Sequence, residues 1–527
     1  MRPRPLVLVL ALVASAGGTR VASAQDAASP IRKRTTYEDL QLFGQVLNQI
    51  RVNHPDSIDA HDLFVAAVEG MVQAADPHSY VIPVVRLEEG KQQAYDDGRL
   101  HPVPIAFAYV GGAPVVVSVA AGTEARQLDI LPGDELVAIQ GANVTAHSAE
   151  ELDIVLSGAK KSMVKLTFER RRDDGSIVRL ERNVKREKGD DESAVPTSFL
   201  LDPVTGYVRV TTFNGERVAD DLHAALDRLE KAGMQRLILD LRDNGGGSVA
   251  EAAHVAGEFL PRGTIVYTTD GRKPEITDTG RVKRSFWKDQ RRFPIVVMVN
   301  GGTASASELV AGALQDHDRA LIFGRPTYGK SLLMRGFPMS DGSLLMLVVG
   351  HVRTPCGRVV QRQYRSISRR EYYRLARAER DTSGRPTCHT DSGRTVYGGG
   401  GIFPDVAMSA LVPVPRWAGR IEEQQLPLAW SGGYVDAHGA TLGSPDAFAA
   451  HDLPATALSD FRAFAARQGL TVPTDGDALL QEILLRSVAY AKWGSEGVYR
   501  VIAQRDAAVT QAVAAFAQAA ALNGPSH

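Results

Sequence analysis

The sequence predicts a multidomain α/β protein that has a layered core, a β-rich region before that core and helical regions at both ends. Between residues 193 and 410, short apolar runs alternate with amphipathic helical patterns, which is typical of strand–helix units. Residues 87–188 instead contain short strands separated by turns. Residues 30–86 and 411–527 show mainly helical periodicity. A chain of 527 residues is long enough for these several domains.

Residues 1–24 have the features of a secretory signal peptide. A basic start at Arg2 and Arg4 precedes an apolar run from Leu6 to Ala14, and a small-residue cleavage site ends at Ala24. The apolar run is too short to cross a membrane, and no later stretch is long enough. We therefore expect cleavage after Ala24 and an exported chain with no stable membrane span. The style of the signal favours a bacterial periplasm, and a retained anchor is the alternative.

Composition argues against some classes of partner and ligand. The chain has 60 Lys and Arg against 61 Asp and Glu with no dominant basic block, which disfavours nucleic acid as a partner. Its two cysteines, Cys356 and Cys388, can form a disulfide in an exported protein, and two free thiols are the alternative. Together with the nearby His389 they do not make a four-ligand zinc set, so we expect no metal there.

Two helices are expected before the β-rich region. Apolar residues recur at helical spacing between residues 34 and 54, and a second helix is expected over about 60–75. The second helix ends at Asp76-Pro77-His78-Ser79, where the proline restricts the backbone and Asp76 can cap the turn. We interpret His78 as a turn residue.

In the β-rich region, strands are expected at 115–119 and 163–170, with a short helix at 148–156. Residues 131–141 read L-P-G-D-E-L-V-A-I-Q-G, a tight turn that runs into a strand. Pro102 and Pro104 lie in the loop before the first strand. Because proline has no backbone N–H group, this loop has fewer hydrogen-bond donors.

The core region contains strand-then-helix units that bear candidate functional residues. Residues 237–241 form a buried strand that leads into Gly245-Gly246-Gly247, and a helix follows over 248–259. A second buried strand at 295–299 leads through a glycine turn into a helix that starts near Ser305, with Glu308 in its first turn as a helix-start signal.

Ser305 is a candidate nucleophile because it lies where a strand turns into a helix, whose N-terminus favours developing negative charge. A serine needs a base to act as a nucleophile. Lys330 is the candidate base, and it follows an apolar strand at 320–323 and a turn that contains Gly and Pro. Full burial can lower a lysine pKa by about 3–5 units and so make it a neutral base. The cluster Asp316-His317-Asp318 lies at the other end of the helix that Ser305 begins, so we interpret it as polar groups of the helix end.

The sequence N-G-G-T-A-S-A-S-E at 300–308, followed by G-K at 329–330, resembles the carboxyl-terminal processing (tail-specific) serine proteases. Three further stretches are similar to signatures of that family: D-L-R-x-N-x-G-G at 240–247, T-P-x-G-R at 354–358 and G-G-I-x-P-D at 400–405. The resemblance runs from about residue 36 to 406. It implies a ClpP/crotonase-like layered protease core at 193–410. The L-P-G-D-E-L stretch resembles a PDZ domain, which would be inserted at 87–188.

The resemblance also implies roles for individual residues. Ser305 would be the nucleophile and Lys330 the base of an acyl-enzyme mechanism that needs no cofactor or metal. The backbone N–H groups of Gly246 and Ala306 would form the oxyanion hole, and proteins or peptides would be the substrates. The family usually reads G-K-G-x-x-Q, with the glutamine holding the lysine in position, but here the corresponding residue is Met334. Three other residues are candidates for orienting the lysine: Ser307, Asp316 and Ser331.

Two other functions remain open at this stage. A catalytically weak peptide-binding scaffold of the same fold would explain Met334 and the proline-containing loop. An acyl-CoA enzyme of crotonase-like shape is disfavoured by the signal peptide, because CoA chemistry is cytoplasmic. The Ala-rich helix expected at 507–521 has few charges and needs a partner surface, which predicts packing or a possible homo-oligomer through the C-terminal helices.

Overall fold

The computed structural model describes residues 35–82, 100–110, 113–120, 123–146, 149–171, 176–187, 193–283, 291–340, 342–365, 371–372, 374–375, 381–408 and 414–522. The predicted signal peptide lies outside the described residues. The chain divides into a unit that ends at Met71 and a second unit that starts at Val72. None of the described helices has both the length and the apolar character that crossing a bilayer requires.

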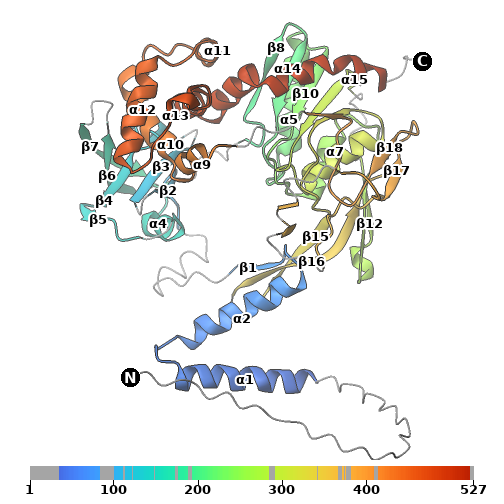
Figure 1. Ribbon diagram of the computed structural model, residues 1–527, viewed down its shortest axis with the longest axis horizontal. Helices are drawn as coiled ribbons and strands as arrows, with labels where there is room; N and C mark the ends of the chain where they lie inside the picture. Colours follow the sequence, from blue (N-terminus) through green and yellow to red (C-terminus); the bar gives the residue numbers. More distant parts are fainter. Residues whose placement is uncertain are drawn as a thin grey trace, which may run out of the picture. The chain divides into compact units, whose positions relative to one another are not determined.

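The first unit contains helix α1 (Thr36–Asn53) and most of helix α2 (Ala60–Ala75), which confirms both predicted helices (Figure 1). Helix α1 begins at Thr35 with a capping box, because the Thr35 hydroxyl accepts from the N–H of Glu38 and the Glu38 carboxylate accepts from the N–H of Thr35.

The β-rich region is an antiparallel sheet in the order β2-β3-β4-β6-β7, with β5 paired to β4. Its own core includes Val116, Leu136, Leu152 and Phe168, which are all fully or almost fully buried. Within the sheet, β2 is an edge strand and packs against α4. The elements are β2 (Ile105–Val110), β3 (Ala113–Val119), β4 (Glu135–Ile139), β5 (Ala142–Asn143), α4 (Ala149–Leu156), β6 (Met163–Arg171) and β7 (Ile177–Lys185).

The predicted core contains a six-stranded sheet in the order β19-β14-β13-β10-β9-β8, which is parallel except for the pair β8–β9. A second sheet has the order β1-β16-β11-β12, and β15 also pairs with β16. The strands are β1 (Tyr80–Ile82), β8 (Thr197–Asp202), β9 (Thr205–Arg209), β10 (Arg236–Asp240), β11 (Ile265–Gly271), β12 (Asp278–Arg281), β13 (Ile295–Val299), β14 (Leu321–Gly324), β15 (Leu332–Pro338), β16 (Leu344–Arg353) and β19 (Val406–Ala407).

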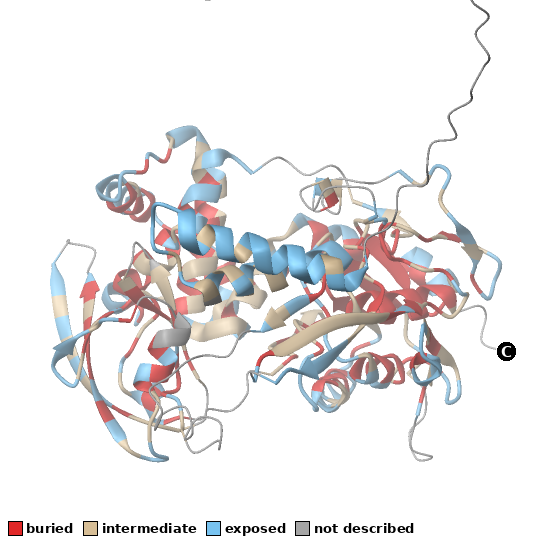
Figure 2. Cartoon of the chain, turned by 90° about the horizontal axis from the view of Figure 1, so that it is seen from below, coloured by how far each residue is buried: buried red, intermediate tan, exposed pale blue. Residues whose placement is uncertain are grey.

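Helices cover both faces of the six-stranded sheet. Its inner strands β9, β10, β13 and β14 are almost entirely buried, and buried residues are red in Figure 2. On one face, Val297 and Val299 pack with helices α5 (Val218–Lys231), α6 (Val249–Ala256) and α7 (Ala306–Asp316). On the other face, Val296 and Met298 pack with α14 (Ala507–Ala514) and α15 (Phe516–Leu522). This two-sided burial explains why the strand at 295–299 reads as a continuous apolar run.

The C-terminal region is helical, as predicted, with a separate core that includes Trp430, Phe461 and Leu484. Its Ala-rich last part finds its partner surface within the chain, because α14 and α15 cover the six-stranded sheet. A homo-oligomer through these helices stays a prediction. The remaining helices are α9 (Arg416–Glu423), α10 (Leu426–His438), α11 (Pro445–Ala449), α12 (Ala455–Arg467) and α13 (Asp477–Arg505).

Cys356 and Cys388 are joined by a disulfide, which is one of the two alternatives that the sequence leaves open. Cys356 follows β16, and Cys388 lies on β17 (Thr387–His389), which pairs with β18 (Thr395–Tyr397). The bridge joins two positions that are 32 residues apart in the sequence.

Candidate active site

Ser305 lies at the turn between β13 and α7, and its backbone is strained. Its φ of 57° and ψ of −118° are unusual for a residue other than glycine. Such conformations cost roughly 1–3 kcal/mol and are concentrated at functional sites. The side chain is partly exposed, whereas Ala304 and Ala306 on either side are buried. A similar arrangement of strand, sharp turn and helix presents the nucleophile in α/β-hydrolases.

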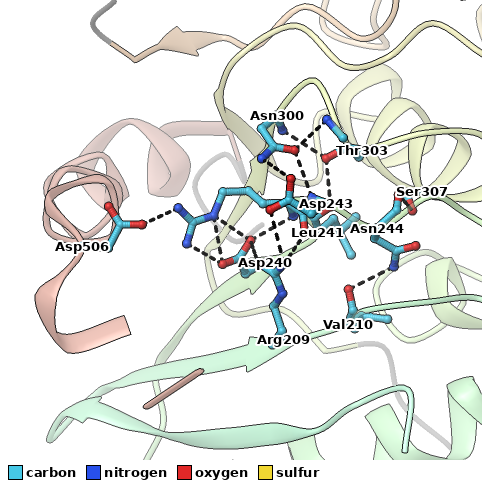
Figure 3. Close-up of polar contacts among 12 residues, drawn as sticks. Arg209, Val210, Asp240, Leu241, Asp243, Asn244, Asn300, Thr303, Ser307 and Asp506 are labelled. Atoms are coloured by element: carbon cyan, nitrogen blue, oxygen red, sulfur yellow. Dashed lines mark hydrogen bonds and ion pairs between the residues drawn. The ribbon is translucent and has the colours of Figure 1, made fainter. Parts of the chain in front are cut away.

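The turn that carries Ser305 is tied to the loop that follows β10. The Thr303 hydroxyl donates to the carbonyl of Leu241 at 2.8 Å, and the Asn300 amide donates to Asp243 at 2.9 Å (Figure 3). The Asn244 carbonyl also accepts from the Ser307 hydroxyl at 2.9 Å. The two loops therefore form one polar unit, which positions the glycine residues against Ser305.

Gly246 lies in direct contact with the turn that carries Ser305. A Cβ atom at this residue would lie 2.7 Å from the Cβ of Ser305 and 2.9 Å from the nitrogen of Ala306, and φ is +99°. Only glycine tolerates both the approach and the backbone conformation. The N–H of Gly246, which we predicted to be an oxyanion donor, is engaged in this structure, because it donates to Oδ1 of Asn244 at 2.9 Å. Ala306 is the first residue of α7, so its N–H has no intrahelical acceptor.

We expect Gly246→Ala to lower kcat at least about 100-fold, because the added methyl group would separate the loop from Ser305. Gly245→Ala is the matched control, since Gly245 lies in the same loop, has nothing within 4 Å of the Cβ position and has no positive φ. Peptide-cleavage kinetics and melting curves of both variants test this. Equal activity of the two variants would contradict the role of the close approach.

Glu308 connects the two predicted catalytic residues. It is fully buried, and its Oε2 atom accepts both the N–H of Ser305 and the N–H of Lys330, each at 2.8 Å. Its Oε1 atom accepts from the N–H of Gly329 at 2.8 Å and from the hydroxyl of Thr327 at 2.5 Å. A single carboxylate therefore holds together the backbone of the turn at Ser305 and the backbone of the loop at 327–330.

The pKa of Lys330 is set by the burial of its own side chain and by two nearby carboxylates. Desolvation lowers the pKa of Lys330, while the carboxylates of Glu308 and Asp76 act in the opposite direction. Burial also raises the pKa of Glu308 to about 7, against the effect of its four hydrogen-bond donors. The shift of Lys330 has the direction that a neutral lysine base requires.

The turn at 76–79 is buried and close enough to act on Lys330, which the sequence interpretation missed. Asp76 accepts from the N–H groups of His78 and Ser79 at 2.8 and 2.7 Å. The His78 ring bonds to the hydroxyl of Tyr372 at 2.9 Å. His78 is thus a buried turn residue, as interpreted, but it also belongs to a polar network.

The three residues predicted to orient Lys330 bond elsewhere. The Ser307 hydroxyl donates to the Asn244 carbonyl, and the Ser331 hydroxyl donates to the Val352 carbonyl. Asp316 pairs with the buried guanidinium of Arg358 at 2.6 Å, at the C-terminal end of α7. An 11-residue helix is about 16 Å long, so Asp316 is too far from the Ser305 end to take this role.

Gln361 holds the backbone next to Lys330, because its Oε1 accepts from the N–H of Ser331 at 2.9 Å. Gln361 is itself bonded to the Tyr372 hydroxyl at 3.3 Å, and therefore to the network of His78. Met334 lies on β15 and pairs with Val348 on β16.

Comparisons with known proteins agree with this geometry. Residues 204–367 match the family described as peptidase family S41, and this range contains Gly246, Ser305, Glu308 and Lys330. A carboxy-terminal-processing protease of Bartonella bacilliformis is 29% identical over 334 residues, which cover 62% of this chain and 74% of that protein. The chloroplastic carboxyl-terminal-processing peptidase 2 of Arabidopsis thaliana is 35% identical over 306 residues, which cover 55% of this chain and 56% of that protein.

Among solved structures, the photosystem II D1 C-terminal processing protease aligns with 71% of this chain and 87% of its own, at 24% identity and a TM-score of 0.34. The matches in sequence carry the assignment: residues 204–367 match peptidase family S41, and the chain is a serine-type peptidase similar to the carboxy-terminal-processing proteases.

Proposed function

We propose that this chain is an exported serine endopeptidase that cleaves protein tails or unfolded segments through a Ser305–Lys330 dyad. The observation that carries the proposal is the bonding of both backbone N–H groups to one oxygen atom of Glu308. Such a clamp keeps a nucleophile and its base at a constant separation, which is the geometric requirement of a catalytic dyad.

The chemistry follows from these positions. The neutral amine of Lys330 takes the proton of the Ser305 hydroxyl as its oxygen forms a bond to the scissile carbonyl carbon. The tetrahedral oxyanion is stabilised by the N–H of Ala306 and by that of Gly246, once the latter turns from Asn244 to the substrate. The ammonium of Lys330 then protonates the leaving amine as the C–N bond breaks, and water hydrolyses the acyl-enzyme.

The preference for tails rests on two features. The relatives are named for processing carboxyl termini. In addition, the β-rich region has a sheet edge, β2, beside helix α4, and a peptide can bind such an edge by adding a strand. We therefore propose that this region is a PDZ-like module that receives substrate. Export is supported by the signal-like residues 1–24 and by the disulfide.

An active-site label tests the proposal. A fluorophosphonate should modify Ser305, and Lys330→Met should slow the labelling about 1,000-fold, because the serine then lacks its base. Mass spectrometry of the labelled peptide identifies the serine. Lys273→Met is the control, because Lys273 is an exposed lysine whose ion-pair partner is Glu275, and this variant should label at the wild-type rate.

Wild-type protein that resists the label and cleaves no unfolded substrate would contradict the dyad. It would favour the alternative, a peptide-binding scaffold of the same fold. Labelling of a serine other than Ser305 would contradict the assignment of the nucleophile.

A further inference from the structure

The junction between α13 and α14 reaches the loop that carries Gly246. Asp506, the residue between these helices, accepts a hydrogen bond from the guanidinium of Arg242 at 2.5 Å (Figure 3). We propose that Asp506 is a positioning residue of the active site, which acts through Arg242 on the glycine loop. This inference rests on the proposed function, and it makes the C-terminal helices part of the support of the catalytic centre.

The first argument is charge. Asp240 is fully buried and accepts from Arg242 at 2.7 Å, from Arg209 at 2.9 Å and from the Tyr207 hydroxyl at 2.7 Å. Two guanidinium groups thus surround one buried carboxylate. The side chain of Arg209 is only 7% exposed and that of Arg242 only 13%. The exposed carboxylate of Asp243 lies 3.8 Å from Arg209, and Asp506 supplies a further carboxylate, which faces Arg242. A poorly solvated cation that lacks part of its countercharge is costly, so the site depends on this contribution from the C-terminal region.

The second argument is connectivity. Arg242 precedes Asp243 and Asn244, and Asn244 contacts the nucleophile turn and the glycine loop. Its carbonyl accepts from the N–H of Ala304 at 2.9 Å, and its side chain accepts from the N–H of Gly246. If Arg242 moves, the residues that follow it move with it, and Asn244 transmits the movement to Gly246 and to the turn that carries Ser305.

The third argument is that Asp506 is itself held in place. Its Oδ1 atom caps α14 by accepting from the N–H of Ala508 at 2.8 Å, which leaves Oδ2 for Arg242. Helix α14 packs on the sheet through Ala508, Val509 and Ala512. The carboxylate is thus placed by a helix that lies outside residues 204–367, the range matched by the peptidase family.

The test is Asp506→Asn, which keeps an oxygen that can cap α14 and removes the charge that faces Arg242. We expect kcat to fall about 10-fold and KM to stay within about twofold, because the interaction acts on the catalytic loop. The melting temperature should also fall, since the Arg242 cation loses part of its countercharge. The matched control is Asp452→Asn. It removes an ion pair with the neighbouring Arg505 that does not involve the glycine loop, and it should leave kcat unchanged.

Two further measurements separate positioning from general stability. In an Arg242→Gln background, Asp506→Asn should add no further loss of kcat, since its effect is transmitted by Arg242. Hydrogen exchange, followed by mass spectrometry, should speed up in the peptide that covers residues 240–248 in Asp506→Asn but not in Asp452→Asn.

The proposal is overturned if Asp506→Asn behaves like Asp452→Asn in both kcat and exchange, or if its effect is undiminished when Arg242 is absent. Failure of the proposed function has a different signature: the wild-type protein would neither cleave nor take the fluorophosphonate label. In that case the exchange data alone still decide whether Asp506 holds the loop.

Discussion

Ser305→Ala should abolish peptide cleavage, and Ser305→Gly should abolish it while making the protein more stable than the alanine variant. Loss of the nucleophile of a serine protease lowers kcat by about a million-fold. The difference in stability comes from the backbone, because alanine at φ 57° and ψ −118° remains strained, whereas glycine adopts that conformation freely. Relief of strain, less the extra chain entropy of glycine, should favour the glycine variant by about 1 kcal/mol.

The measurement is a pair of urea unfolding curves together with cleavage of an unfolded protein substrate. Ser307→Ala and Ser307→Gly provide the comparison, since Ser307 lies two residues further on, inside α7, with helical backbone. There glycine should be the less stable of the two by about 1 kcal/mol. If glycine were also the less stable residue at position 305, the strain would not be a property of the folded protein. Residual cleavage at the wild-type rate would exclude Ser305 as the nucleophile.

Much of the fold is predictable because its signals are local. The apolar run at 295–299 is short and rich in β-branched residues, and the serine-rich stretch after it is a helix start, so a strand–turn–helix unit follows from adjacent residues. The partners of that strand are not local. The sequence does not reveal that Val296 and Met298 are covered by helices more than 200 residues further along the chain.

The candidate site likewise contains residues that local sequence signals predict and residues that they do not. Ser305, Lys330 and Gly246 are proposed from short stretches of sequence, because the proposed chemistry needs particular residues beside glycine turns. Glu308 is indistinguishable from an ordinary residue of a first helical turn until the loop at 327–330 is seen to fold over it. Asp316 illustrates the converse error: its residue type makes it a candidate partner of Lys330, but Arg358 is its partner in space.

Glu308→Ala should remove both activity and a large part of the stability of the core. Four donors would lose their acceptor in a fully buried place, and each unsatisfied donor costs about 1–3 kcal/mol. Because these costs are not additive, we expect a loss of at least about 4 kcal/mol in the free energy of unfolding. Loss of the clamp should also lower kcat by at least about 1,000-fold, since Ser305 and Lys330 would no longer share an acceptor.

Glu308→Gln is the sharper variant, because it keeps the shape of the side chain and one accepting oxygen while it removes the ability to ionise. Its NH2 group replaces the other oxygen, so two of the four donors lose their acceptor. The folded-state pKa of Glu308 is about 7, above its ordinary value of 4.5. Its protonated form therefore stabilises the folded state fully below about pH 4.5, and this stabilisation is lost as the pH rises through about 7. The loss amounts to about 3 kcal/mol. Unfolding curves between about pH 4.5 and 8 should show this slope in the wild type and a flatter one in Glu308→Gln.

The same substitution makes an independent prediction for Lys330. The negative charge of Glu308 raises the pKa of Lys330 against the opposite effect of burial, so removing that charge should lower the pKa further. A lysine base is active when neutral, and the alkaline rise of kcat/KM with pH should therefore move to lower pH in Glu308→Gln, even though the maximal rate falls. If the alkaline rise of kcat/KM stays at the same pH in Glu308→Gln while the pH dependence of the free energy of unfolding changes, the group that titrates in the kinetics is not Lys330.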